Sequence, residues 1–363
     1  MRDVLILGGY GNFGKRIATA LNRLGVPVTL AGRNLAKAQT LAANLPLARA
    51  TVVDIHRDLK ACLLRETPSV VVHTSGPFQG ADYAVARACI QARCHYVDLA
   101  DARDFVRDFG ELDAQARAAG VTAISGASTV PGLASAVIGH FRPYFAKLDR
   151  VDFGISPGQR AERGLATTRG ILSYAGKRLR PFAGHNQAYG WMDNRSQVYP
   201  GLGRRWFANC DIPDLDLLPA AYGLGDIRFG AGMELPLLHF GLYALAGLVR
   251  LGLPLDLPRL AAPLLAASNL FDFFGSDAGG MHMILSGTGP DGQPLSKTWF
   301  IVADHGDGPQ IPTVPAILLA KRLHEKDPSL GAKALSAGAY PCVGLVSLEA
   351  YLEALAPFSV KTY

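Results

Sequence analysis

The sequence predicts an α/β protein in which a doubly wound parallel sheet is followed by a second, α+β domain. Up to about residue 125, short apolar or β-branched runs alternate with amphipathic segments of helical length, as in βαβ units. From about Leu148 the segments are longer and are interrupted by glycine and proline. A chain of 363 residues also exceeds the size at which one hydrophobic core normally stops growing, so two compact domains are expected.

Six short runs are predicted as the strands of the first sheet. They are residues 4–7, 26–30, 50–53, 69–73, 95–99 and 121–125. Between the strands, apolar residues at helical spacing predict helices with one buried face. Two such stripes are Phe13, Ile17, Leu21 and Leu24, and Phe105, Phe109, Leu112 and Ala116.

In the second domain, residues 283–286 and 297–303 predict paired strands, because Asp291-Gly292 between them is a strong turn former. Residues 315–323 predict a helix with proline at its start. The apolar segments 235–249 and 261–271 are too short for a bilayer, which needs about 20 residues. They predict two buried or interfacial helices. Their role stays open between a dimer surface, a lipid pocket and contact with a membrane surface.

Composition limits the partners and the compartment. Hydrophobic residues make up 49% and charged residues 18%, which is typical of a globular chain, and the net charge of +6 is scattered rather than clustered. Such a charge favours an anionic small molecule and argues against nucleic acid. The five cysteines form no metal-ligand spacing, and the apolar run 4–7 is too short for a signal peptide, so we expect no metal and a cytoplasmic protein.

The first strand ends in Gly8-Gly9-Tyr10-Gly11-Asn12-Phe13-Gly14, where Gly9, Gly11 and Gly14 satisfy G-x-G-x-x-G between a strand and a helix. This context indicates a Rossmann domain whose helix N-terminus binds a dinucleotide pyrophosphate. A plain strand–turn–helix corner is the alternative. A nucleoside-triphosphate loop is disfavoured, because Arg16 stands where that loop needs a hydroxyl.

The end of the second strand predicts NADP(H) in preference to NAD(H). NAD-selective domains place a carboxylate there, but this chain has Arg33 and Asn34, and no acidic residue occurs between Asp3 and Asp54. The guanidinium of Arg33 can pair with a 2′-phosphate, although it can also be a solvated surface group.

Two further loops complete the predicted cofactor site. Asp54 follows the third strand, where it can accept from the adenine or cap a helix. Ser75-Gly76-Pro77-Phe78 follows the fourth strand and is expected on the nicotinamide side, unless it is an ordinary proline turn.

These motifs together resemble the saccharopine dehydrogenase-like family of NADP-binding oxidoreductases. The resemblance also rests on residues 94–99 and 126–132, and it covers about the first 140 residues. It implies a Rossmann domain at 1–130, an α+β substrate and dimerisation domain at 131–310, and C-terminal helices at 311–363 that return to the first domain. It also implies a helix opened by Pro131-Gly132 beside the nicotinamide.

Asp98, Tyr96 and His305 are the candidates for proton transfer. Asp98 and Tyr96 lie at the end of the fifth strand, and His305 lies with His282 by the predicted hairpin. Structural roles are the alternative for each. No tyrosine has a lysine four residues on, which argues against a short-chain dehydrogenase.

The expected function is an NADP(H)-dependent oxidoreductase, a homodimer that acts on a C=N, C=O or C=C bond of a small-molecule, possibly apolar, substrate. The alternative is a non-catalytic NADP(H)-binding protein, a redox-responsive or membrane-surface scaffold.

Overall fold

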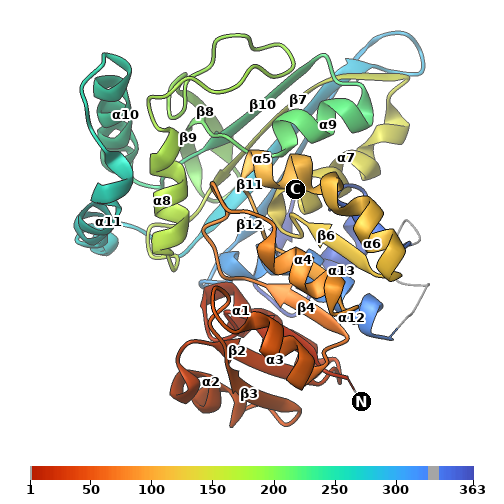
Figure 1. Cartoon of the computed structure of the whole chain (residues 1–363). Helices are drawn as coiled ribbons and strands as arrows, with labels where there is room; N and C mark the ends of the chain where they lie inside the picture. The colour runs from red at the N-terminus through yellow and green to blue at the C-terminus, as the bar shows by residue number, and fades with distance from the viewer. Residues whose placement is uncertain (1, 326–334) are drawn as a thin grey trace. The chain divides into compact units, whose positions relative to one another are not determined.

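The computed structural model describes residues 2–325 and 335–363 (Figure 1). The chain divides into two compact units. One comprises Met1–Ala136 and Gln310–Ala354, and the other comprises Val137–Pro309 and Leu355–Tyr363. Each unit is built on a sheet of seven strands.

The first unit is a doubly wound parallel sheet with the strand order β13-β6-β5-β4-β1-β2-β3. This is the Rossmann order, with one additional parallel strand beyond β6. The strands are β1 (Val4–Leu7), β2 (Val28–Gly32), β3 (Ala48–Val52), β4 (Val70–His73), β5 (His95–Asp98), β6 (Thr122–Ser125) and β13 (Gly338–Pro341). All four residues of β1 are buried, as expected for a central strand covered on both faces.

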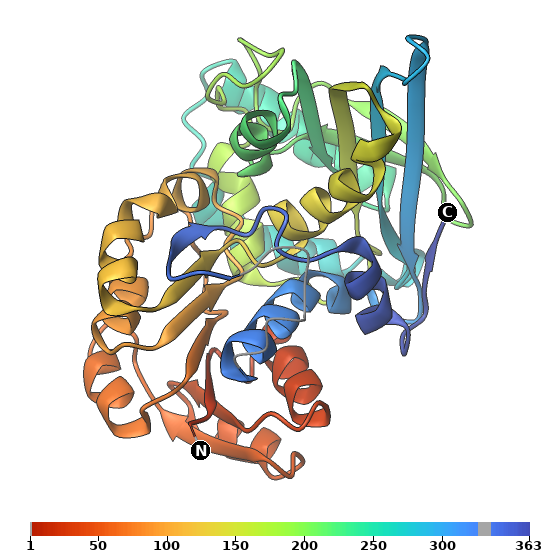
Figure 2. The same cartoon turned by 90° about the vertical axis from the view of Figure 1, so that its right-hand side faces the viewer.

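Helices cover both faces of this sheet. The helices are α1 (Asn12–Arg23), α2 (Leu35–Ala42), α3 (Leu59–Glu66), α4 (Ala84–Gln91), α5 (Arg103–Arg107), α6 (Asp113–Ala119), α12 (Val314–Glu325) and α13 (Leu348–Leu355). Figure 2 shows α12 beside α1 on one face and the run from α3 to α6 on the other. The predicted α/β class is therefore confirmed.

Three details of the first unit differ from the sequence prediction. The strand β13 was not predicted, and β2 begins at Val28 because Pro27 before it has no N–H for the ladder. The stripe from Phe105 to Ala116 is buried as expected, but its path is α5, a 3-10 turn at Asp108–Leu112 and then α6, not one helix.

The second unit is a mixed sheet with the order β14-β12-β11-β7-β10-β9-β8, in which only the β7–β10 pair is parallel among the described strands. The strands are β7 (Lys147–Ser156), β8 (Arg195–Tyr199), β9 (Gly203–Asn209), β10 (Asp226–Ala231), β11 (Gly279–Thr288), β12 (Pro294–Ala303) and β14 (Val360–Thr362). The predicted hairpin is β11–β12, with Met283 opposite Trp299, and it is longer than expected.

The helices of the chain's middle part are α7 (Ala134–Phe141), which crosses the boundary between the units, and α8 (Leu165–Tyr174), α9 (Asp214–Tyr222), α10 (Pro236–Arg250) and α11 (Ala261–Asn269). A buried cluster that includes Leu172, Trp191 and Leu242 joins α8 and α10. Within residues 2–325 and 335–363, no helix combines the length and the apolar character needed to cross a membrane.

Candidate cofactor site

The candidate site lies at the carboxyl edge of the first unit's sheet. The chain leaves β1 toward β2 on one side, whereas β4 pairs with β1 on the other side. Loops that follow β1 and β4 therefore diverge at this point, and ligands of open α/β sheets bind in such a crevice.

The glycine-rich loop after β1 is sterically constrained. A Cβ on Gly14 would lie 2.2 Å from the carbonyl oxygen of Gly8, and one on Gly11 would lie 3.1 Å from the same atom. Gly9 passes close to β2, since a Cβ added to it would lie 3.0 Å from the Cα of Leu30. A side chain at Gly14 would push α1 away from β1, and one at Gly9 would push the loop away from β2, so the loop needs its glycines for close packing.

The N-terminus of α1 has the properties of an anion site. Its N-cap is Gly11, so no side chain caps the helix, and no acidic residue lies in its first turn. The positive end of the helix dipole therefore faces the edge of the sheet, beside the backbone of Asn12, Phe13 and Gly14. A pyrophosphate fits this arrangement without a basic side chain.

Tyr10 connects the glycine-rich loop to the end of β2. Its hydroxyl accepts a hydrogen bond from the backbone N–H of Asn34 at 3.0 Å. The ring lies against Gly32, where a Cβ would come within 2.6 Å of it. The side chain of Asn34 in turn accepts from the N–H of Lys37 at 3.0 Å and caps α2. Tyr10 and Asn34 therefore form one joined surface beside β2.

Cationic side chains surround this surface. Arg33 is exposed and makes no hydrogen bond or ion pair to any residue that the structure describes. A pocket of about 490 Å³ adjoins the Tyr10–Asn34 surface. It is lined by Tyr10, Lys15, Asn34, Ala36, Lys37, Thr40, Leu41 and Asn44. Lys15 and Lys37 were not among the residues predicted from the sequence. The signal was available, because each lies in the first turn of the helix that follows a predicted binding loop.

Asp54 begins a turn after β3. Its carboxylate accepts from the N–H of His56 at 3.0 Å and lies 3.8 Å from the guanidinium of Arg57. It does not cap α3, whose N-cap is Asp58. The carboxylate is half-buried and stays at the edge of the sheet.

The Ser75-Gly76-Pro77-Phe78 loop lies directly beside the glycine-rich loop. A Cβ on Gly8 would lie 2.7 Å from Oγ of Ser75, and Gly8 has a φ of +79°, which a side chain would strain. The ring of Phe78 is buried, 5.1 Å from the ring of His73. The loops after β1 and β4 thus meet at the point where the strand order reverses.

Asp98 and Tyr96 lie at the end of β5 and are fully enclosed. The Oδ1 atom of Asp98 accepts from the N–H groups of Ala100 and Gly126 and from the hydroxyl of Ser125, at 2.8 to 2.9 Å. Burial raises the pKa of Asp98 to about 6, although the N–H donors oppose the shift. The hydroxyl of Tyr96 lies 3.0 Å from Nδ1 of His73, whose pKa burial lowers to about 4.

The two histidines near the β11–β12 hairpin belong to the second unit. The ring of His305 is 77% exposed, and its Nδ1 lies 3.9 Å from a carboxylate oxygen of Asp304. His282 is buried, and its Nδ1 lies 2.8 Å from the hydroxyl of Tyr199. Burial lowers the pKa of His282 to about 3, so its ring is neutral at physiological pH.

Comparisons with known proteins agree with this architecture. Residues 4–124, about a third of the chain, match the family model of the saccharopine dehydrogenase NADP binding domain. No curated protein matches the sequence. Among solved structures, the apo form of saccharopine dehydrogenase (L-Glu forming) from Saccharomyces cerevisiae aligns over all of both chains, with 14% identity and a TM-score of 0.64. An amine dehydrogenase from Mycobacterium smegmatis aligns over 89% of this chain and 91% of its own, with 14% identity and a TM-score of 0.49.

At 14% identity the structural likeness to the yeast enzyme shows a shared fold. The family match is to the domain that holds the glycine-rich loop, Arg33 and the loop after β4, and it supports NADP(H) binding. Residues 4–124 thus match the NADP binding domain of saccharopine dehydrogenase, and over this part of the chain the predicted resemblance to that family is supported.

Proposed function

We propose that the protein is an oxidoreductase that uses NADP(H) in preference to NAD(H). The observation that carries the preference is the charge around the end of β2: Arg33, Lys37 and Lys15 lie near the Tyr10–Asn34 surface, and residues 4–53 contain no carboxylate. A 2′-phosphate would meet cations and no repelling group. The helix N-terminus at Gly11 would hold the pyrophosphate, with Asn12 and Phe13 beside it.

When bound, NADP(H) supplies or accepts the hydride at the carbon of a C=N, C=O or C=C bond. The loop Ser75–Phe78 is proposed to border the nicotinamide, because it follows the strand on the other side of β1. Its Phe78 ring packs against the rings of His73 and Phe105 and so holds this loop against the domain. Asp54 is proposed to lie at the adenine end.

We propose Asp98 and Tyr96 as residues that position the loops rather than as proton donors in contact with substrate. Asp98 joins the loop after β5 to the loop after β6 through Ala100 and Gly126, and it is fully buried. His305 keeps an exposed ring, and it remains the proposed group for proton transfer. The predicted homodimer and cytoplasmic location remain predictions.

The experiment that tests cofactor choice is calorimetric titration of the purified protein with NADPH and with NADH. We expect Arg33→Ala to weaken the binding of NADPH about 10- to 100-fold, because a charge-assisted hydrogen bond to the 2′-phosphate is lost. The affinity for NADH should change little. The exposed Arg23, at the far end of α1, supplies the control variant Arg23→Ala. Equal losses for both nucleotides would refute the preference.

Turnover is tested separately by NADPH absorbance with imine, keto and enoyl compounds. Consumption that requires one of these classes supports the oxidoreductase and names the bond. Tight NADPH binding with no turnover on any class would favour the non-catalytic alternative instead. Failure to bind either nucleotide would overturn both.

A further inference from the structure

The helix α10 exposes an apolar face. Its buried positions are His239, Leu242 and Ala246, which share one side of the helix. The opposite side, normally polar in a surface helix, carries Leu237, Phe240 and Leu248 in exposed positions. The helix is therefore apolar all round although one side of it faces solvent.

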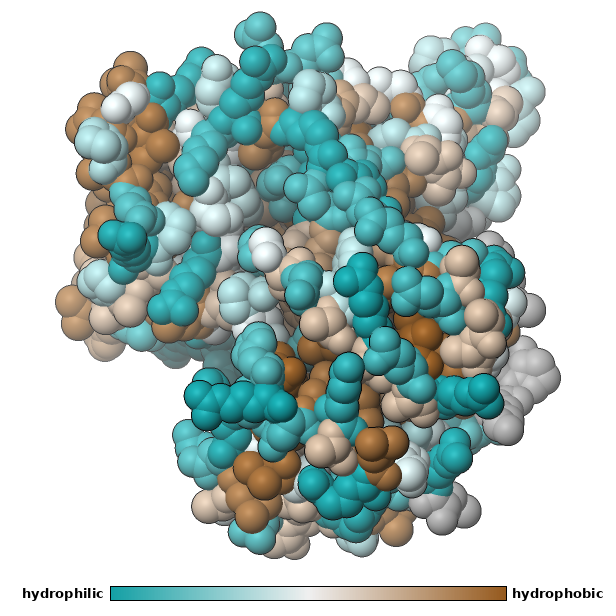
Figure 3. Space-filling view, viewed as in Figure 1, coloured by the Kyte–Doolittle hydropathy of each residue, from teal (hydrophilic) through white to brown (hydrophobic). Residues whose placement is uncertain are grey.

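The exposed apolar residues continue beyond α10. The apolar patch comprises Leu237, Phe240, Leu248, Leu251, Leu253, Leu260, Leu270, Phe273 and Phe274. Its most prominent part is the turn after α11, where Leu270 is 79% exposed, Phe273 85% and Phe274 70%. Figure 3 shows apolar side chains gathered along the edge where Figure 1 draws α10 and α11. Apolar surface that is this exposed and this extensive marks an interaction site.

Cations border the apolar patch, whereas its acids are neutralised. Arg160 is exposed and donates to the backbone oxygen of Asp272 at 3.1 Å, just before the Phe273–Phe274 turn. The carboxylate of Asp272 itself pairs with Arg163. At the other end, Arg259 pairs with Asp256 at 2.9 Å and Arg250 ends α10.

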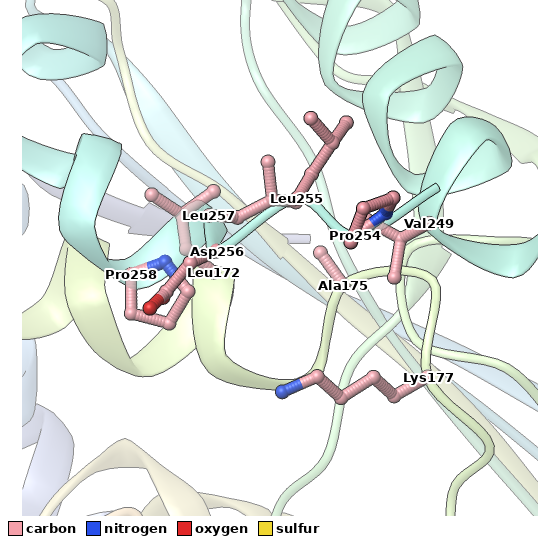
Figure 4. A pocket seen from close by; sticks show the side chains of 9 residues that line it. All are labelled: Leu172, Ala175, Lys177, Val249, Pro254, Leu255, Asp256, Leu257 and Pro258. Carbon is pink, nitrogen blue, oxygen red and sulfur yellow. The ribbon is translucent and has the colours of Figure 1, made fainter. Parts of the chain in front are cut away.

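A pocket of about 350 Å³ opens within the same surface (Figure 4). Leucines and prolines of the segment between α10 and α11 form one wall, together with Val249, and α8 supplies Leu172. Lys177 extends its side chain along the pocket (Figure 4), and no described residue pairs with its amine. The pocket thus combines largely apolar walls with the amine of Lys177 and with the carboxylate of Asp256, which pairs with Arg259.

We propose that the apolar patch docks on a bilayer that contains anionic phospholipids. Exposed Phe and Leu side chains insert at the boundary of headgroups and acyl chains, and basic side chains at the edge meet the lipid phosphates. Lys177 and its pocket would receive a headgroup and part of an acyl chain. A second copy of the chain suits the patch less well, because a two-fold interface would bring the cations of Arg160, Arg250 and Lys177 against the same surface of the partner.

The test is co-sedimentation of the full chain with vesicles of phosphatidylcholine, alone or mixed with phosphatidylglycerol. Binding to the mixed vesicles is expected to be about tenfold stronger, and to weaken as salt is raised. The double variant Phe273→Ser, Phe274→Ser should lose about tenfold or more of this binding, since it removes two large, exposed apolar side chains from the centre of the proposed contact. Lys177→Gln should weaken binding to the mixed vesicles only.

The matched control is the double variant Leu64→Ser, Val198→Ser, which removes two exposed apolar side chains outside the patch. It should bind vesicles like the wild type, and thermal melting should show all variants folded. Three results would overturn the proposal: no vesicle binding by the wild type, equal binding by the phenylalanine variant, or a lipid-free dimer that the phenylalanine variant dissociates in sedimentation equilibrium. The last would assign the patch to a second copy.

Discussion

The hydroxyl oxygen of Tyr10 lies 3.0 Å from the backbone nitrogen of Asn34, so the glycine-rich loop and the loop after β2 are joined by a hydrogen bond. The bond crosses from the proposed pyrophosphate site to the proposed 2′-phosphate site. Gly32 permits it, because any side chain there would strike the Tyr10 ring. The two halves of the proposed adenosine site are therefore held in register before the nucleotide binds.

Gly32→Ala should disturb this connection. Its Cβ would lie 2.6 Å from the Tyr10 ring, so the ring must move and the hydrogen bond to Asn34 is lost. We expect both NADPH and NADH to bind about fivefold more weakly, in line with about 1 kcal/mol for one hydrogen bond. Calorimetry measures this, with Gly110→Ala as control because nothing lies within 4 Å of a Cβ there. A loss confined to NADPH would contradict the explanation.

Lys37→Gln should weaken the binding of NADPH and leave the binding of NADH unchanged. Lys37 lines the pocket beside Asn34, and only its backbone N–H takes part in the cap of α2, so the variant leaves the helix start intact. A single exposed cation contributes about 0.5–1 kcal/mol, so NADPH affinity should fall about two- to fivefold, and less at high salt. The exposed Lys60 on α3 provides the control variant Lys60→Gln. An equal loss of NADH affinity would remove Lys37 from the proposed phosphate site.

Gly14→Ala tests the packing of the glycine-rich loop. The added methyl group would lie 2.2 Å from the oxygen of Gly8, which is backbone and cannot rotate away. We expect the free energy of unfolding to fall by about 1–3 kcal/mol, the range for overpacking a well-packed site, together with nucleotide binding. Gly139→Ala is the matched helical control, since its Cβ meets nothing within 4 Å and alanine favours helix. Unfolding in urea measures the stability of both variants. Equal stability of Gly14→Ala and Gly139→Ala would disprove the steric argument.

The alternation of apolar runs and amphipathic segments was sufficient to predict the first sheet. All six predicted strands are present, and the central strands β1 and β4, which are covered on both faces, are nearly continuous apolar runs. The strand β13 has no such run: Gly338-Ala339-Tyr340-Pro341 joins the sheet only through tertiary contact with β6. Likewise, the bend of the chain between Phe105 and Ala116 leaves the apolar spacing unchanged, so periodicity could not reveal it.

The candidate cofactor site was predictable where a motif requires backbone geometry. A Cβ on Gly14 would clash with backbone and a Cβ on Gly9 or Gly11 would be tightly crowded, so the spacing of these glycines carries information by itself. Lys15 and Lys37 were missed because a cation on a helix is ordinarily a solvated side chain. The enclosure of Asp98 was not predictable either, since it depends on donors from residues 100, 125 and 126.

The buried carboxyl group of Asp98 makes the free energy of unfolding depend on pH, and burial determines the direction of that dependence. Burial raises its pKa from the ordinary 3.8 to about 6, so between these values the folded protein holds a proton that the unfolded chain has released. The free energy of unfolding therefore falls as pH rises through this window. The stabilisation from Asp98 is complete below about pH 4 and is lost above about pH 6.

Asp98→Asn should remove this dependence. The amide oxygen of asparagine can accept from Ala100, Ser125 and Gly126 as Oδ1 does, but the side chain cannot ionise. The difference in free energy of unfolding, variant minus wild type, should increase by about 2 kcal/mol from pH 4 to pH 6, since one pH unit corresponds to at most about 1.4 kcal/mol and the slope is smaller near each pKa. Urea unfolding at several pH values measures it. Any change in packing adds a constant, so a difference that stays the same across the window would mean that the Asp98 carboxyl is not the group that titrates.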